Sequence, residues 1–358
     1  MGSRRKRSPW PLALLFRLAV IAAAVSLFMS YISLYINPSA TSIPLYFGLY
    51  FIPLVFINLF ILLLGIIRRS GAVWITFIIL LPSILFADMF VRWGEVNIGP
   101  EGTALKVCTY NVGTFTQGHK KDRNFNISGI EKFIASQDPH IVCFQEFYIK
   151  DTNEIKGILS NYPYRYYHLF GTRSNTKFGN ITYSKYPIVN GGKLVFKGST
   201  NLCIYTDIML GGKTVRIYNT HLESHSISFT TLVKRMRESS SVTEEIYEVH
   251  DRMAGTFRKR ALQVDSIVSH ANGSNYLSII CGDLNDTPMS YTYNKLTNDK
   301  EDSFRQSGKG FSATYSLFWP LLRIDYILYP SPIWSLSHNT PRIRYSDHFP
   351  VVSELTIP

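Results

Sequence analysis

Three long apolar runs in the first hundred residues limit the possible folds of this chain more than any other feature. The runs cover Leu18–Ile36, Pro44–Ile67 and Ala72–Val91. Each has about the 20 residues that a helix needs to cross the roughly 30 Å of hydrocarbon in a bilayer. We therefore expect residues 1–95 to form a membrane anchor, with three transmembrane helices at about 18–36, 44–67 and 72–91.

The basic residues around these runs predict an orientation. The cluster at 4–7 and the pair Arg68–Arg69 favour the cytoplasmic side, and the loop at 37–42 holds no Lys or Arg. Three crossings then give an integral membrane protein with a cytoplasmic amino terminus and the rest of the chain outside the cytoplasm. Arg92 near the outer end of the third run opposes this weakly, although Asp88, four residues earlier on a helix, can pair with it. A cleaved signal peptide is the alternative for the first run, but its apolar stretch is long and two further runs follow it.

The remainder of the chain has the composition of an ordinary soluble domain. The first hundred residues hold eight Lys and Arg but only two Asp and Glu, so half of the net charge of +12 lies there. The mildly basic remainder permits binding to phosphates or anionic surfaces without requiring it. The four cysteines have neither the spacing of a CxxC metal site nor that of a disulfide framework, so we expect buried free thiols, with one disulfide left open.

Residues 96–104 form a short linker with Gly and Pro, and residues 105–358 alternate apolar runs with polar loops. Alternation and turn residues predict strands at 106–110, 141–144, 214–219, 276–280, 323–328 and 349–355, with several more over 161–210. Apolar residues at helical spacing predict a helix at 126–136, and a long charged stretch at 225–272 reads as mostly helical.

Polar side chains that can bind metals or move protons follow one predicted strand after another. They are Asn111, Glu146, His221, Asp283 with Asn285, and Asp347 with His348. Each alone can be a turn residue, a surface acid or a structural histidine. Asp325 is harder to dismiss, because a carboxylate inside an apolar strand is costly unless it is paired. Five such coincidences indicate a shared site at one edge of a sheet.

The same segments, in this order, resemble the endonuclease/exonuclease/phosphatase superfamily, the metal-dependent phosphoesterases related to pancreatic deoxyribonuclease. They are TYN at 109–111, QE at 145–146, GNITYSKYPI at 179–188, NTHLES at 219–224, GDLND at 282–286, RIDYIL at 323–328 and SDHFPV at 346–351. No single segment is decisive, but the ordered set covers nearly all of 104–358. The resemblance implies an α/β fold, a four-layer α/β/β/α sandwich of two mixed sheets, with the active site at the edge where the strands end.

The resemblance also implies a metal site and a hydrolytic reaction. Glu146 would be the principal ligand of Mg²⁺, with Mn²⁺ as an alternative, and Asn111 and Asp347 would assist it directly or through water. Oxygen ligands of this kind suit a hard divalent cation. Asn180 is a further candidate for a contact to the substrate phosphate.

The remaining residues would act on the attacking water and on the phosphate. By resemblance, Asp283 would orient and deprotonate the water, and Asn285 and His221 would donate hydrogen bonds to the phosphorus centre. His348 would complete the phosphate clamp or assist proton transfer, with Asp325 holding its ring and favouring the protonated form. The expected function is thus a metal-dependent hydrolase of phosphoester bonds.

The substrate is left open, because this superfamily cuts DNA, RNA, phosphoinositides, sphingomyelin and nucleotide-like molecules with one core. We expect two partners, the lipid bilayer and a phosphoester substrate, and no protein partner. A lipid headgroup is slightly favoured, since the short linker keeps the site near the bilayer and a basic helix around 234–260 could face anionic lipid. A membrane-tethered nuclease acting on DNA or RNA is the alternative, for which Tyr162–Tyr167 could stack on bases, although strand-and-loop core is the simpler interpretation of that stretch. A non-catalytic tethered binding protein is a remote third, because no catalytic position is broken.

Overall fold

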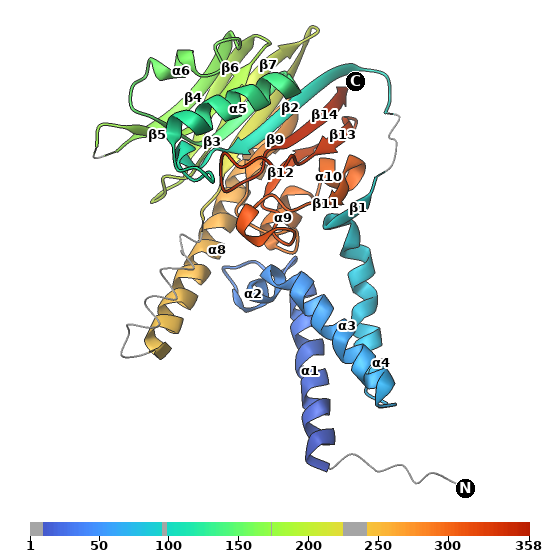
Figure 1. Cartoon of the computed structure of the whole chain (residues 1–358). Helices are drawn as coiled ribbons and strands as arrows, with labels where there is room; N and C mark the ends of the chain where they lie inside the picture. Colours follow the sequence, from blue (N-terminus) through green and yellow to red (C-terminus); the bar gives the residue numbers. More distant parts are fainter. Residues whose placement is uncertain (1–9, 95–98, 173, 225–241) are drawn as a thin grey trace. The chain divides into compact units, whose positions relative to one another are not determined.

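The computed structural model describes residues 10–94, 99–172, 174–224 and 242–358, and these form two compact units (Figure 1). The first unit comprises the apolar helices up to Ala87 together with residues 289–291, and the second comprises the rest of the chain from Asp88 onward. The basic cluster at 4–7 and part of the expected linker at 96–104 lie outside the described residues.

The first unit contains short helices rather than three long ones. Its elements are α1 (Trp10–Ile32), α2 (Ile43–Leu49), α3 (Phe51–Ile67), α4 (Val73–Leu80) and the 3-10 helix η1 (Leu81–Met89). Among the described residues, only α1, with 23 residues, is by itself long and apolar enough to cross a membrane, and a signal sequence near an amino terminus passes the same test. The expectation of three transmembrane helices is therefore not supported.

Prolines and a glycine account for the broken helices. The pair α2 and α3 bends by 77° at a break that falls on Tyr50. Gly48 is a poor helix former, and Pro53 lacks the N–H that would continue the helix across the break. In the third run, α4 ends at Leu80, and the chain continues as a 3-10 helix of nine residues with Pro82 at its second position.

Two polar side chains join the helices of this unit. The buried Asn58 on α3 donates an amide hydrogen bond to Ala23 O on α1 at 3.0 Å. The Tyr31 hydroxyl on α1 donates to Ile79 O on α4 at 2.8 Å. Because few polar partners are present among these apolar residues, each such bond fixes the packing of one helix against another.

The second unit is built on two six-stranded sheets, and Figure 1 labels most of their strands. One sheet has the order β13-β14-β2-β3-β5-β4, and its strands are β2 (Thr103–Asn111), β3 (Ile141–Ile149), β4 (Tyr164–Gly171), β5 (Lys177–Ser184), β13 (Trp334–Asn339) and β14 (Val351–Ile357). The other has the order β10-β12-β9-β8-β7-β6, and its strands are β6 (Ile188–Val195), β7 (Leu202–Leu210), β8 (Lys213–His221), β9 (Leu277–Asp283), β10 (Glu301–Asp302) and β12 (Asp325–Tyr329). Each sheet has one parallel pair, β2 with β3 and β8 with β9, among antiparallel neighbours. The prediction of an α/β fold with two mixed sheets is confirmed.

Helices and a small ribbon complete the unit. The long helices are α5 (Arg123–Gln137) and α8 (Val242–Asn272), and the short ones are α6 (Glu154–Gly157), α9 (Tyr291–Leu296), α10 (Ser303–Ser307) and the 3-10 helices η2 (Gly113–Phe115) and η3 (Ser316–Phe318). The ribbon pairs β1 (Val91–Trp93) with β11 (Lys309–Phe311). Just before it, Asp88 forms an ion pair at 2.9 Å with Arg305 of α10, a partner that the sequence analysis did not consider. Arg305 lies 217 residues away in the sequence, so helical spacing could not identify it as the partner of Asp88.

Alternation along the strands divides the core into layers. On β2, Cys108 and Tyr110 pack with residues of α5, whereas Leu105 and Val107 belong to the cluster shared with the other sheet. The outer face of the second sheet meets α8, where the Tyr218 hydroxyl lies 2.7 Å from a ring nitrogen of His270. All four cysteines are buried and free, as expected.

Candidate functional site

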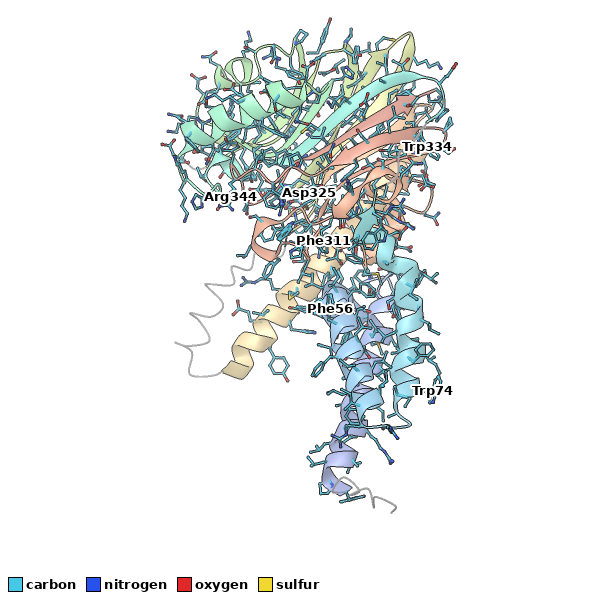
Figure 2. The ribbon with its side chains drawn as sticks, turned by 45° about the vertical axis from the view of Figure 1, so that its right-hand side comes forward. Phe56, Trp74, Phe311, Asp325, Trp334 and Arg344 are labelled. Atoms are coloured by element: carbon cyan, nitrogen blue, oxygen red, sulfur yellow. The ribbon has the colours of Figure 1, made fainter. Side chains whose placement is uncertain are left out.

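Strand register aligns three of the predicted site residues in one row. His221 of β8 pairs in register with Asp283 of β9, which in turn pairs with Asp325 of β12. Each continues the odd-numbered positions of its strand that line the space between the sheets. From the other sheet, Asn111 at the end of β2 donates its amide to Asp283 Oδ2 at 2.9 Å. The two sheets therefore meet at these side chains, and Figure 2 labels Asp325 among them.

A β-bulge brings Glu146 to this row. The pairing of β3 with β5 shifts register between Phe144 and Phe147, and Glu146 has a positive φ of 50°. Such a conformation is costly for a residue with a side chain, and bulges often redirect a functional group. Here Glu146 Oε1 lies 3.1 Å from Asn111 Nδ2 and 3.6 Å from His221 Nε2, and the side chain remains 30% exposed.

A tight turn after β9 holds Asn285 against Asp283. Asn285 also has a positive φ, of 52°, and its backbone N–H donates to Asp283 Oδ1 at 2.8 Å. Its amide nitrogen donates to Leu222 O at 2.9 Å and lies 3.3 Å from Asp283 Oδ2. Only glycine fits at 282, because a Cβ there would lie 1.9 Å from Thr220 O. The turn thus fixes both carboxylate oxygens of Asp283.

Asp325 and His348 form a buried pair beside Asp283. His348 Nδ1 donates to Asp325 Oδ2 at 2.9 Å, and His348 Nε2 lies 3.8 Å from Asp283 Oδ2. Burial by itself lowers the pKa of His348, but the carboxylates of Asp325 and Asp283 outweigh burial and raise that pKa to about 10. His348 is therefore protonated at neutral pH. Thr314, which sequence reasoning missed, accepts the backbone N–H of Asp325 at 3.1 Å.

His221 and Asp283 carry opposite shifts for the same reason. Burial lowers the pKa of His221 even though Asp283 opposes the shift, and burial raises the pKa of Asp283 to about 6, with Asp325 adding to it. His221 Nε2 is buried without a hydrogen-bond partner among the described residues. It lies 3.8 Å from Asp283 Oδ2 as well as near Glu146. An unsatisfied nitrogen beside two carboxylates is a place where a ligand or a water can bind.

Asp347 reaches the same edge through a neighbouring serine. The Ser346 hydroxyl donates to Asn111 O at 2.8 Å and lies 3.2 Å from Asp347 Oδ1. A Cβ on Gly113, whose φ is +51°, would lie 2.9 Å from that Asp347 oxygen, so the close approach requires glycine. Neither Ser346 nor Gly113 was singled out from the sequence, because their role depends on contacts between distant segments.

Two groups of side chains here have the donor atoms of a divalent metal site. The ligand atoms of Asp283, Asp325 and His348 all lie within 4.8 Å of one another. That group is already held together by hydrogen bonding, and a protonated imidazole has no lone pair for a metal. The second group, Glu146 and Asp347, offers carboxylate oxygens, the donors that a hard cation prefers, and burial raises the pKa of Glu146 with the nearby Asp347 adding to the rise.

Asn111 differs in detail from its expected role. Its amide oxygen accepts the Gly113 N–H at 3.0 Å, and its amide nitrogen faces Glu146 and Asp283. In this conformation Asn111 orients the two carboxylates instead of offering an oxygen to a metal.

Asn180 lies beneath the edge and not on it. It is fully buried, and its amide donates to Asn219 O at 3.1 Å and Leu202 O at 3.3 Å. It therefore joins β5 to the opposite sheet.

A layer of amides supports the site from below, and sequence reasoning missed it. Gln145 Nε2 donates to Asn219 Oδ1 at 2.8 Å and to Thr109 Oγ1 at 3.0 Å, and Asn219 Nδ2 donates to Ile181 O at 2.9 Å. Gln145 and Asn219 face the space between the sheets. Asn219 lies two residues before His221, the last residue of β8. The sequence signal for this layer was the position of Gln145 in the QE segment and of Asn219 in the NTH segment.

The described part of α8 keeps part of the expected basic face at 234–260, because Arg252, Arg258 and Lys259 are exposed. Arg260 is fully buried, with its Nε 3.6 Å from Asp286 Oδ2, and Lys259 pairs with Glu223 at 2.9 Å. Residues 234–241 lie outside the described residues. In the aromatic stretch, Tyr162 is a core residue whose hydroxyl donates to Pro139 O at 2.7 Å.

Comparisons with known proteins agree with this geometry. Residues 108–348 match the Endonuclease/Exonuclease/phosphatase family, and residues 13–89 match a domain of unknown function, DUF8431. No curated protein matches the chain.

Three solved structures resemble the second unit in fold. An endonuclease/exonuclease/phosphatase from Beutenbergia cavernae has 17% identity and a TM-score of 0.52, over 71% of this chain and 72% of its own. A family protein from Bacteroides thetaiotaomicron has 17% identity and a TM-score of 0.52, over 72% of this chain and 96% of its own. The catalytic domain of human Nocturnin, with a bound sulfate anion, has 15% identity and a TM-score of 0.52, over 71% of this chain and 94% of its own. At such identities the likeness shows the fold alone.

Proposed function

Because the chain belongs to the endonuclease/exonuclease/phosphatase family, whose members are hydrolases acting on phosphoester bonds, we propose that it is a membrane-anchored, divalent-metal-dependent phosphoesterase. The observation that carries the proposal is the meeting of His221 Nε2 with Glu146 Oε1 at 3.6 Å and Asp283 Oδ2 at 3.8 Å. A buried ring nitrogen that has no hydrogen-bond partner among the described residues, and that lies between carboxylates from opposite sheets, suits a water and an anionic phosphate better than it suits a structural role.

The metal would be held by Glu146 and Asp347, with Asn111 orienting the carboxylates. Mg²⁺ is the cation that we favour, because the site offers oxygen donors and Glu146 remains partly open to solvent. A divalent cation supplies positive charge against the phosphate when it is bound.

The other side chains divide the work of hydrolysis. Asp283, whose pKa is about 6, is ionised at neutral pH and can orient a water and accept its proton. His348, protonated and held by Asp325, would donate to a phosphate oxygen. Neutral His221 and the amide of Asn285 would stabilise the negative charge that develops on the phosphate oxygens.

A lipid headgroup phosphoester is the substrate class that we favour over nucleic acid. On the described part of α8, Arg260 is buried, and Lys259 and Arg252 pair with carboxylates, so less positive charge is available there to a nucleic acid backbone, although Arg258 stays exposed. The apolar helix α1 supports a location at a membrane.

The side of the membrane depends on the number of crossings. With the amino terminus in the cytoplasm, a single crossing by α1 would place the catalytic domain outside. A second crossing by the bent pair α2 and α3 would return it to the cytoplasm. Protease protection of the domain in sealed, oriented vesicles distinguishes the two.

The test is product release by the purified full chain with Mg²⁺, on a panel of phospholipids, phosphoinositides, and single- and double-stranded DNA. Glu146→Ala and Asp283→Ala are the site variants, and Asp151→Asn, which changes an exposed carboxylate in a surface loop, is the matched control. We expect activity on a lipid that both site variants lose and the control keeps. Activity on DNA alone would refute the lipid assignment, and activity that survives both site variants would refute the site.

A further inference from the structure

Exposed apolar side chains gather on one loop of the catalytic domain. Residues 315–322 (YSLFWPLL) carry no charge, and Leu317 is 66%, Phe318 48% and Trp319 42% exposed. Leu321 in the same loop is also exposed. Single exposed apolar residues are ordinary, but four within five positions need an explanation.

The ribbon of β1 and β11 extends this surface. The ring of Phe311, 53% exposed, meets the Trp319 ring edge-on at 6.2 Å. The pairing of Val91 with Phe311 and of Trp93 with Lys309 puts Trp93 on the same face of the ribbon as Phe311, and Trp93 is 91% exposed. We call these six residues the apolar ridge: Trp93, Phe311, Leu317, Phe318, Trp319 and Leu321.

The ridge begins at the catalytic edge. The backbone N–H of Ser316 donates to Asp347 O at 2.8 Å, and Tyr315 forms an isolated antiparallel bridge with His348. Trp319 follows Ser316 by three residues, a reach of at most about 10 Å along the chain. Figure 2 labels both Phe311 on the ribbon and Asp325 in the site.

Cations border the ridge. The Arg342 guanidinium lies over the Trp319 ring at 4.7 Å from its centroid, and Lys309 sits on β11 beside Phe311. Neither has a carboxylate partner within the described part of the chain. Tryptophan, phenylalanine and leucine bordered by Arg and Lys are the residues that proteins place at the interface of an anionic bilayer.

The chain connection also favours a membrane as the occupant. Only Phe90 separates the apolar segment Val73–Met89 from β1. A bilayer around that segment would therefore lie within about 14 Å of Trp93 along the chain.

We propose that the apolar ridge inserts into the interfacial layer of a bilayer that contains anionic lipid, and that it presents the catalytic edge to phosphate groups of lipid headgroups. The proposal rests on the proposed phosphoesterase function for its catalytic part. Its structural part, the insertion of the ridge, does not depend on hydrolysis and can be measured alone.

Insertion is tested with a spin label on the full chain in nanodiscs of phosphatidylcholine and phosphatidylserine. Leu317→Cys carries the label, and Val195→Cys on the edge strand β6, 52% exposed, is the control. The four native thiols are buried and leave the introduced cysteine as the reactive one. We expect the label at 317 to be accessible to oxygen, which concentrates in the bilayer, and protected from a water-soluble nickel chelate, with the reverse at 195.

Two results would overturn the insertion. A label at 317 that meets the nickel chelate as readily as the label at 195 lies in water. A label protected from both oxygen and nickel lies against protein, as a second copy of the chain would produce.

A kinetic measurement tests the link to catalysis. The double variant Phe318→Ser/Trp319→Ser is compared with the unsubstituted chain on a vesicle-embedded phospholipid and on soluble bis(p-nitrophenyl) phosphate. Because two half-exposed apolar side chains are removed, we expect the ratio of the lipid rate to the soluble rate to fall about tenfold or more. An unchanged ratio would overturn the link. If the unsubstituted chain hydrolyses neither substrate, the proposed function fails, and the spin-label result still decides the insertion.

Discussion

The ion pair between Arg323 and Asp302 holds the beginning of the strand that carries Asp325, and Asp302→Asn breaks it with little change in shape. The Arg323 and Asp302 side chains are 2% and 1% exposed, and Arg323 Nη2 lies 2.7 Å from Asp302 Oδ2. That oxygen also accepts the Tyr293 hydroxyl at 2.7 Å, while Asp302 Oδ1 accepts the Phe304 N–H at 2.9 Å. An asparagine can keep the bond to Phe304 but leaves the guanidinium without its counter-charge.

The expected loss of stability is large, because an unpaired buried charge costs about 3–5 kcal/mol. In the variant the guanidinium keeps its contact with the Tyr326 ring, whose centroid lies 4.6 Å from the guanidinium carbon, and a desolvated cation–π contact contributes about 2 kcal/mol. Tyr326 makes that contact in the parent as well, so we keep the full range. For a domain of this size the melting temperature should fall by about 6–20 °C.

The assay is thermal unfolding of the full chain in detergent micelles, followed by near-ultraviolet circular dichroism. The double variant Asp302→Asn/Arg323→Met is the control, because it removes both charges, and we expect it to regain at least half of the loss. A single variant within about 1 kcal/mol of the parent would refute the reasoning, since that is the size of an exposed pair.

The same pair predicts a dependence on pH. Burial alone raises the pKa of Asp302, but Arg323 and the hydrogen bond from Tyr293 outweigh burial and hold the pKa below its usual value. A carboxyl with a lowered pKa stabilises the fold above the pKa of the unfolded chain, about 4, and loses this contribution as the pH falls through the folded value. The gap between the parent and Asp302→Asn should therefore narrow below about pH 4.

Three further predictions concern a glycine, a histidine and the four cysteines. Gly282→Ala should lower the free energy of unfolding by more than about 3 kcal/mol or prevent folding, since φ is +135° and the new Cβ would lie 1.9 Å from Thr220 O. The control Gly255→Ala on α8, with open space around it, should be neutral or stabilising. Equal effects of the two variants would contradict this prediction. Burial, helped by Arg323 and opposed by Asp302, lowers the pKa of His338 to about 4. The free energy of unfolding should therefore fall by up to about 3 kcal/mol as the pH drops from about 6.5 toward 4. His338→Gln should flatten this dependence on pH in the same unfolding assay. The four buried thiols should react with a thiol reagent only after denaturation, and rapid labelling of the folded chain would contradict their burial.

The strands and the edge that collects the polar residues could be predicted because their signals are local. GDLND follows an apolar run and SDHFPV precedes one, and alternation along a strand fixes which face a residue takes. His221, Asp283 and Asp325 fall on the same face of neighbouring strands, and the register then brings them into one row.

Other features depend on contacts that sequence spacing does not encode. Arg260 reads as part of a basic face, yet it is buried against Asp286, so the sign of its charge says nothing about its exposure. Asp88 pairs with Arg305, a residue that sequence spacing does not bring near it. The apolar runs have the length of spanning helices, but Pro53 and Pro82 interrupt the second and third, because hydropathy measures composition and not the continuity of backbone hydrogen bonds.

The most direct test of the proposed function is the initial rate at which the full chain hydrolyses bis(p-nitrophenyl) phosphate as Mg²⁺ is titrated. The chain, Glu146→Gln and the control Asp151→Asn are compared, and a chelator is added at the end. We predict a rate that saturates with Mg²⁺, disappears with the chelator, falls by about 10²-fold or more in Glu146→Gln and is unchanged in Asp151→Asn. A rate that does not depend on the Mg²⁺ concentration, or that Glu146→Gln retains, would contradict the assignment of this edge as a metal-dependent phosphoesterase site.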